Sequence, residues 1–156
     1  MTPNQSTNLY QLIEGFRAFA ADHEQINGFG VGPTDEADIA KLSAADHPLL
    51  YITPGTATLD EGSITMDIDI IIATLQPPSE EQRIEVLSNQ LYLMKDTIAW
   101  LKHHLSSDLF REGVTLALPV MCEPFFVRMD NLLVGYATTV SLEWGNENDL
   151  CLVPLG

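Results

Sequence analysis

Apolar residues recur with a helical period near the start of the chain. From Leu9 they fall every three or four positions, as Leu9, Leu12, Ile13, Phe16, Phe19 and Ala20. Residues at this spacing share one side of a helix, so the pattern predicts an amphipathic helix. Asn8 is a candidate N-cap, and Asn27-Gly28 offers a left-handed stop. Residues 1–7 are then an N-terminal arm.

The segment 28–47 has no clear period. It contains three glycines, one proline and the acidic residues Asp35, Glu36 and Asp38. Glycine, proline and acidic residues in such a cluster are typical of loops, so we expect an excursion loop over 28–47. The apolar run 49–53 that follows predicts a buried strand, which Pro54-Gly55 should close.

A period of two marks the next segment, which is typical of a half-buried strand. Apolar residues alternate with Thr65, Asp67 and Asp69 between Ile64 and Leu75. Residues 56–59 and 64–75 flank a short loop that contains Gly62, and this spacing favours a β-hairpin. Asp67 and Asp69 should therefore lie on a wet face of the hairpin, at least along its first half.

A long helix is predicted after Pro77-Pro78. Ser79 and Gln82 have the spacing of a capping box, and two glutamates follow Ser79 at the positive end of the helix dipole. Two apolar rows follow at helical spacing, one of Ile84, Leu87, Leu91, Met94, Ile98 and Leu101, and one of Val86, Leu93 and Trp100. We expect this helix to bury two sides, one against a sheet and one against the first helix.

The remaining strands are predicted at 114–127 and 133–144, joined by a turn around Asp130-Asn131. Pro119 and Pro124 have no N–H for a ladder hydrogen bond, so their strand should be at an edge or bulged. Neighbouring strand residues point to opposite faces, so burying both Phe125 and Phe126 requires two covering layers or an interface.

The segment 146–156 is a predicted C-terminal arm. It ends in an apolar sequence that contains Leu152, Val153 and Leu155, an unusual composition for a dangling terminus. We expect it to dock on its own domain or on a neighbour. The candidate oligomer-interface residues are therefore Pro119, Pro124, Phe125, Phe126, Leu152, Val153 and Leu155.

These elements predict one α+β domain over residues 1–156. Its expected architecture is an antiparallel β-sheet of two hairpins, with the N-terminal helix and the long central helix packed on one face. A chain of 156 residues has the usual size of one domain. No apolar run is long enough to span a membrane, and the first residues lack a signal-peptide pattern, so we expect a cytoplasmic chain.

Charge narrows the function classes. The chain has 7 Lys and Arg against 22 Asp and Glu, a net charge of -15. This argues against gripping nucleic acid, because such affinity depends on cationic side chains that displace counterions. The acidic excess serves solubility alone, or it forms a surface past which DNA slides without sticking.

Candidate chemistry is sparse. Asp67 and Asp69 lie about 7 Å apart at strand spacing and could hold a cation or act as acid and base, although a solvated sheet face explains them better. Asp35, Glu36 and Asp38 lack the order of a calcium loop. Cys122 and Cys151 have no C-x-x-C neighbour, so a zinc site is not expected. We expect no cofactor, no metal and no catalytic residue.

Three parts of the chain carry a resemblance to known proteins: Asn8–Glu14 leading to Gln25–Gly30, His47–Ile52, and Met94–Leu101. With the predicted order of elements, they resemble the tail-terminator and tail-completion (neck) proteins of long-tailed bacteriophages. The resemblance implies a non-enzymatic virion protein. It would form a ring, usually of six copies, that caps the tail tube and joins it to the head–neck connector.

The resemblance also implies partners and a place of assembly. The partners are the tail-tube protein and the connector or neck proteins, with the sheath as a further candidate. Assembly takes place in the host cytoplasm, and the genomic DNA passes through the ring without specific binding. Lumen-facing candidates are the acids Asp35, Glu36, Asp38, Asp67 and Asp69. The alternatives are a head-completion protein, another minor tail component, or a small acidic hydrolase or metal-binding enzyme that uses Asp67 and Asp69.

Overall fold

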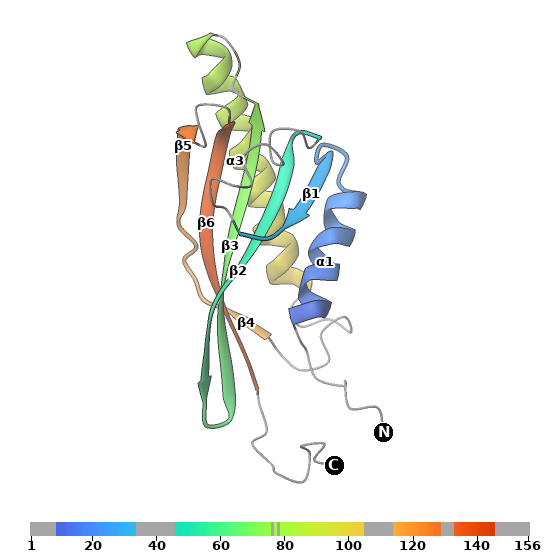
Figure 1. Cartoon of the computed structure of the whole chain (residues 1–156), viewed down its shortest axis with the longest axis vertical. Coiled ribbons are helices and arrows are strands. Elements are labelled where there is room, and N and C mark those ends of the chain that lie inside the picture. Colours follow the sequence, from blue (N-terminus) through green and yellow to red (C-terminus); the bar gives the residue numbers. More distant parts are fainter. Residues whose placement is uncertain are drawn as a thin grey trace.

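The computed structural model describes residues 9–33, 46–75, 77, 79–104, 114–128 and 133–145. Along the chain its elements are α1 (Leu9–Asp22), β1 (Gly28–Val31), β2 (Leu49–Asp60), β3 (Ser63–Leu75), α3 (Glu80–His104), β4 (Val114–Leu116), β5 (Cys122–Arg128) and β6 (Leu133–Gly145). The described part is an α+β structure with one six-stranded sheet and two helices (Figure 1).

The sheet is mixed, whereas the sequence predicted an antiparallel one. Its strand order is β1-β2-β3-β6-β4, and β5 also pairs with β6. β1 runs parallel to β2, and the other pairs are antiparallel. One edge of β6 follows β3 over its whole length, while its other edge is shared between β5 and β4. The expected two hairpins therefore describe the topology only in part.

The predicted excursion loop begins with β1. The backbone amides of Asn27 and Gly28 both donate to the Pro48 carbonyl, which brings the chain alongside β2. The ring of Tyr51 lies so close to Gly30 that a Cβ there would sit 2.9 Å from the ring. α1 also ends at Asp22 and not at the predicted stop Asn27-Gly28, because that dipeptide begins the parallel pairing. Residues 34–45 lie outside the described part of the chain.

The β2–β3 hairpin confirms one prediction and extends it. The turn is Glu61-Gly62, and Gly62 has a φ of +83°, a conformation that glycine adopts at little cost. β2 does not stop at Pro54-Gly55 but continues to Asp60, with a register shift between Pro54 and Ala57. β1 pairs with β2 only as far as Ile52. Pro54 therefore lies beyond the stretch of β2 that needs donors on both edges.

The main core lies between the helices and the inner face of the sheet. It combines even-numbered strand residues with residues of both helices, namely Leu12, Phe16 and Ala20 of α1, Leu93, Met94 and Leu101 of α3, and Leu50, Ile52, Ile68, Ile70, Ile72, Val140, Leu142 and Trp144 of the sheet. Val140, Leu142 and Trp144 alternate along β6, which confirms a strand in the predicted range 133–144. α1 and α3 also meet directly, because the Trp100 ring lies 5.4 Å from Phe16 and 5.1 Å from Phe19, centroid to centroid.

The start of α3 agrees with the sequence, since the Gln82 amide donates to the Ser79 hydroxyl at 3.1 Å. The first apolar row agrees only in part: Leu87, Met94 and Leu101 are buried and Ile98 is half-buried. Ile84 and Leu91 are 55% and 44% exposed, whereas Gln90 and Thr97 are buried. The buried residues Leu87, Gln90, Met94, Thr97 and Leu101 share one side of α3, and Ile84 and Leu91 lie beside that side, toward solvent. In Figure 1 the first turns of α3 extend beyond the end of the sheet.

Candidate functional site

The outer face of the sheet, opposite the main core, divides into two halves. Odd-numbered residues of β2, β3 and β6 point to it. Toward one end Tyr51, Ile71, Ala73 and Leu133 form a small second core together with Phe125 of β5. Toward the other end the same strands carry polar side chains. At one end the outer face is therefore covered by its own apolar core, and at the other end it is polar.

Asp67 and Asp69 occupy the polar half, as the alternation predicted. Each pairs across the ladder with a hydroxyl residue of β6. The Thr139 hydroxyl donates to Oδ1 of Asp69 at 2.6 Å, and the Ser141 hydroxyl donates to Oδ1 of Asp67 at 2.6 Å. Such charge-assisted bonds fix the orientation of both carboxylates. The predicted wet face is thus confirmed along the first half of β3.

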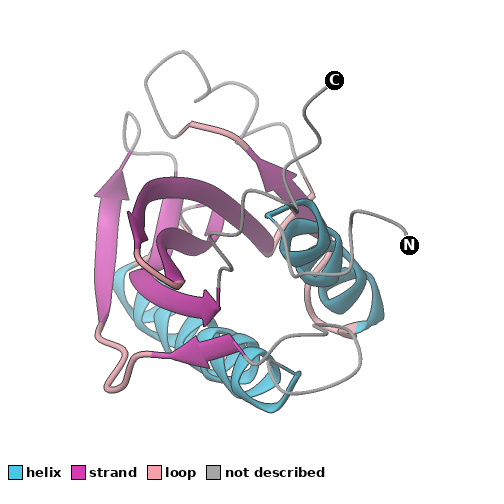
Figure 2. Ribbon diagram, turned by 90° about the horizontal axis from the view of Figure 1, so that it is seen from below, coloured by secondary structure: helices cyan, strands magenta, loops and turns pink. Residues whose placement is uncertain are grey.

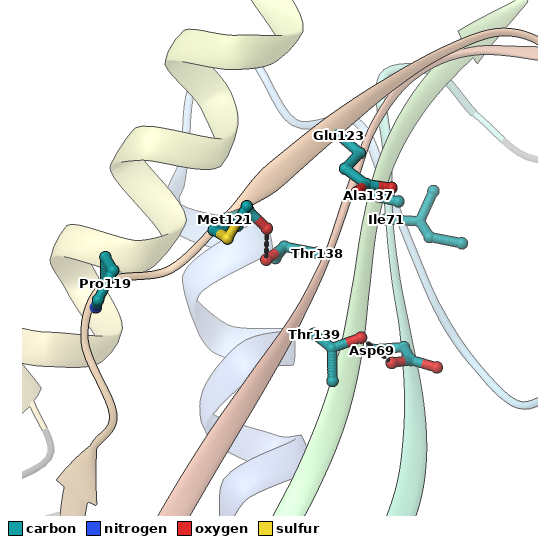
Figure 3. A pocket seen from close by; sticks show the side chains of 8 residues that line it. All are labelled: Asp69, Ile71, Pro119, Met121, Glu123, Ala137, Thr138 and Thr139. Atoms are coloured by element: carbon teal, nitrogen blue, oxygen red, sulfur yellow. Dashed lines mark hydrogen bonds between the residues drawn. The ribbon is translucent and has the colours of Figure 1, made fainter.

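A hollow of about 500 Å³ opens beside Asp69 (Figure 3). Its lining comes from β3, β5, β6 and the segment before β5, namely Asp69, Ile71, Pro119, Met121, Glu123, Ala137, Thr138 and Thr139. Asp69 and Glu123 are its two charged residues. Met121 is 75% exposed, so its side chain stands at the open surface. We call this set the acidic hollow.

The sequence did not single out Glu123 or Met121. Glu123 pairs with Ala137, and Ala137 pairs with Ile71 of β3, so three strands bring Glu123 and Asp69 to the same face. The alternation along β5 could have placed Glu123 on that face. The order of the strands, which the sequence did not reveal, was needed to bring it near Asp69.

The strand that contains Pro124 was predicted to lie at an edge of the sheet or to be bulged, and β5 agrees with this prediction. β5 pairs only with β6 among the described strands, and its register shifts between Phe125 and Arg128. Pro119 lies in the connection between β4 and β5, so the predicted strand 114–127 is divided in two. Pro124 is exposed, whereas Phe125 is buried in the second core of the same chain.

Several candidate residues fall outside what the structure describes. Asp35, Glu36 and Asp38 belong to 34–45, and Leu152, Val153 and Leu155 belong to 146–156. Phe126 lies in β5, but its side chain is not among those described. Their predicted roles at an interface or in a lumen remain predictions.

Cys122, at the start of β5, has little nucleophilic character at neutral pH. Burial raises the pKa of its thiol, and a hydrogen bond with the Thr138 side chain opposes this shift more weakly. The raised pKa keeps the sulfur protonated near pH 7, and the thiolate is the reactive form. Cys122 is a free thiol. Cys122 is half-buried, at the margin of the main core.

The residues that could form an enzyme site are dispersed. Across the described ranges, no group of three or more His, Cys, Asp or Glu side chains could hold a metal ion. His23 lies between α1 and α3, where its Nε2 is 2.9 Å from Oδ2 of Asp96. It therefore belongs to the helix side of the sheet, while Asp67 and Asp69 are on the outer face.

The described Lys and Arg side chains all lie on the two helices, which also carry the acids Glu14, Asp22, Glu80, Glu81, Glu85 and Asp96. The structure describes four Lys and Arg side chains, and three of them, Arg83, Lys95 and Lys102, are on α3. The fourth is Arg17 of α1. The outer face carries Asp67, Asp69, Glu123 and Glu143 by strand alternation. The polar half of the outer face is thus acidic, whereas the helices carry charges of both signs.

No protein-family model matches this chain, and no curated protein matches it. Within the described ranges, neither helix has the length and apolar character that a membrane crossing requires.

Proposed function

We propose that this protein is a structural subunit of a bacteriophage virion, a tail terminator. In this role its copies form a ring that caps the tail tube and joins it to the head–neck connector. The observation that carries the proposal is an acidic sheet face that lies beside strand edges for which the described residues supply no partner strand. Such surfaces suit assembly with other subunits better than reaction with a small molecule.

The strand edges provide the first support. Beyond Ile52 the outer edge of β2 has no partner strand in the described part of the chain, and residues 55–60 are exposed. Leu59, near the tip of the hairpin, is 73% exposed. Unpaired N–H and C=O groups along such an edge are a template for another chain. The β5 edge, with the exposed Pro124, is a second surface of this kind.

The acidic outer face provides the second support. We infer that α1 and α3 together cover the inner face, which leaves the opposite face to line the lumen of the ring. Carboxylates repel phosphates within about a Debye length, roughly 8 Å at physiological salt. Genomic DNA would pass Asp67 and Asp69 without being retained. The Thr139 and Ser141 hydroxyls, which bond these carboxylates, hold the charges in place.

The proposed partners follow from the position in the particle. They are the tail-tube protein on one side and the connector or neck proteins on the other, with assembly in the host cytoplasm. The test combines the purified protein with the tail-tube protein encoded in the same genome. Electron microscopy is expected to show a ring at one end of each tube, and tubes that stop growing. Tubes that grow equally long with and without the protein would exclude a terminator.

The C-terminal arm provides a prediction about assembly. Removing Leu152–Gly156 is expected to weaken self-association at least tenfold and to leave the circular dichroism spectrum unchanged, because the arm is proposed to dock on a neighbouring subunit. Sedimentation measures the association. A full-length chain with Ala at Leu152, Val153 and Leu155 separates side-chain loss from chain shortening. Loss of soluble protein in both variants would show instead that the arm is part of the core.

A further inference from the structure

One side of α3 carries apolar residues at every seventh position. Ile84, Leu91 and Ile98 recur at this step, and seven residues are close to two turns of an α-helix. Ile84 and Leu91 are 55% and 44% exposed, and Ile98 is half-buried. An apolar row of this period is the seam along which one helix packs against another.

α1 packs on the opposite side of α3. At about 100° per residue, Asp96 and Trp100 lie about 140° and 180° from Leu91 around the helix axis. These two residues make the contacts with α1, because Asp96 binds His23 and the Trp100 ring meets that of Phe16. Figure 2, seen from below, shows both helices outside the strands. The apolar row therefore faces away from α1.

Charged residues extend the row at both ends. Glu80 lies four residues before Ile84, Lys102 lies four residues after Ile98, and both are within about 20° of Leu91 around the axis. Glu80 and Lys102 are exposed, and neither has an ion-pair partner within the described ranges. We call Glu80, Ile84, Leu91, Ile98 and Lys102 the α3 stripe. Its steps of 4, 7, 7 and 4 residues are the same from either end, while its charge changes from negative to positive.

The other charges near the start of α3 do not reverse this order. Glu81 and Arg83 lie about 80° from Leu91 on opposite sides of the stripe, so they offset each other, and Glu85 is about 120° away. Toward the end of the helix, Lys95 is about 40° from Leu91 and adds a second positive charge. The α3 stripe is thus acidic at the start of the helix and basic toward its end.

We propose that the α3 stripe docks on the α3 stripe of a second copy, with the two helices antiparallel. A two-fold axis at Leu91 places this residue against its own counterpart. Ile84 of each copy then lies against Ile98 of the other, and Glu80 of each copy lies against Lys102 of the other. The occupant is a second copy because the stripe complements itself in this orientation. A parallel pair would bring like charges together, and it would also align the two helix dipoles.

A contact between two identical surfaces closes at two copies. It uses neither the strand edges nor the acidic outer face, which the proposed function assigns to the ring. The inference therefore goes beyond the proposed function and does not depend on it. One helix from each copy makes a smaller contact than a standard protein interface, so we expect a weak pair that forms at high protein concentration.

Disulfide capture tests the two-fold axis. Leu91→Cys places one thiol of each copy opposite the other, so mild oxidation is expected to give a covalent dimer linked through position 91. Ile84→Cys alone should give at least tenfold less dimer, because position 84 lies opposite position 98. Adding Ile98→Cys to that chain should restore capture. Mass spectrometry of the digested dimer identifies the linked positions, and the wild type measures the background from Cys122 and Cys151.

A charge exchange in the Leu91→Cys chain tests the two ends of the stripe. Glu80→Lys and Lys102→Glu are each expected to slow dimer capture at least tenfold, because either substitution brings like charges together at both ends of a two-fold pair. The chain with both substitutions has the original net charge and is expected to recover to within about threefold. Glu85→Lys changes the net charge as much as Glu80→Lys but lies away from the stripe, so capture should not change.

Circular dichroism verifies the fold of every variant. A folded Leu91→Cys chain without a link through position 91 overturns the proposed contact. Equal capture by Ile84→Cys alone also overturns it, because a parallel pair or random collision gives that result. So does a charge-exchanged chain that shows no recovery. Where Leu91→Cys does not fold, the chain with Ile84→Cys and Ile98→Cys decides.

Capping of tail tubes is measured separately, so the two proposals can fail separately. A chain that caps tubes but is never captured as a dimer loses this contact alone. A chain that is captured as a dimer but never caps a tube loses the terminator function alone.

Discussion

Replacement of Gly135 by alanine is expected to lower the free energy of unfolding by more than about 3 kcal/mol, or to prevent accumulation of soluble protein. Gly135 lies in β6, between β3 and β5. A Cβ at this position would collide with the carbonyl oxygen of Ile72 and lie 2.9 Å from the Cα of Ala73. Both are backbone atoms in the middle of the ladder, so the clash cannot be relieved by turning a side chain.

Urea denaturation followed by circular dichroism measures the loss of stability. The control variant is Gly62→Ala. Gly62 has a positive φ, but a Cβ there meets nothing within 4 Å. Gly62→Ala should therefore cost only about 1 kcal/mol of backbone strain. If Gly135→Ala were no more destabilising than Gly62→Ala, the close approach of β3 and β6 at this position would be wrong.

Replacement of Phe16 by alanine is expected to cost about 3–5 kcal/mol, the usual range for removing a fully buried phenylalanine. Phe16 is 0% exposed and its ring lies 5.4 Å from that of Trp100, so it joins α1 to α3 as well as to the sheet. Its loss removes apolar contact on two sides and leaves a cavity. For a chain of this size each kcal/mol lowers Tm by about 2–4 °C.

Calorimetry measures the loss of stability, and tryptophan fluorescence reports the change around Trp100. The matched control is Tyr10→Ala in the same helix, because Tyr10 is 72% exposed. That variant should remain within about 0.5 kcal/mol of the wild type. Equal losses at the two positions would show that α1 does not bury the face that the structure assigns to it.

Local patterns were sufficient for the elements whose signals lie close together in the chain. Ser79 and Gln82 marked the start of α3 because the cap is a contact over three residues. The hairpin turn at Gly62 was predictable because only a short loop separates β2 from β3. Pro124 correctly indicated an edge strand, since a missing N–H is a property of the residue itself.

The errors arose where distant segments decide the outcome. β1 has only four residues, two of them glycine, and it is stabilised by pairing with β2 and by the Tyr51 ring. Those partners lie some twenty residues further along the chain, so the pattern of residues within the segment does not predict the strand. The first apolar row of α3 was likewise assigned to the core as a whole, although Ile84 and Leu91 are exposed and the polar Gln90 and Thr97 are buried. A helical period identifies an apolar side of a helix, but packing of the whole domain decides which side turns toward the sheet.

The amino-acid sequence by itself determined the acidic character of the protein, its two helices, the β2–β3 hairpin and the polar side of β3 that carries Asp67 and Asp69. Each depends on composition or on spacing within one segment. The tertiary structure alone decided that β6 lies between β3 and the β5 edge, and therefore that Glu123 and Asp69 line one hollow. Strand order depends on contacts between segments far apart in the chain, which are selected by packing of the whole domain and leave no local pattern.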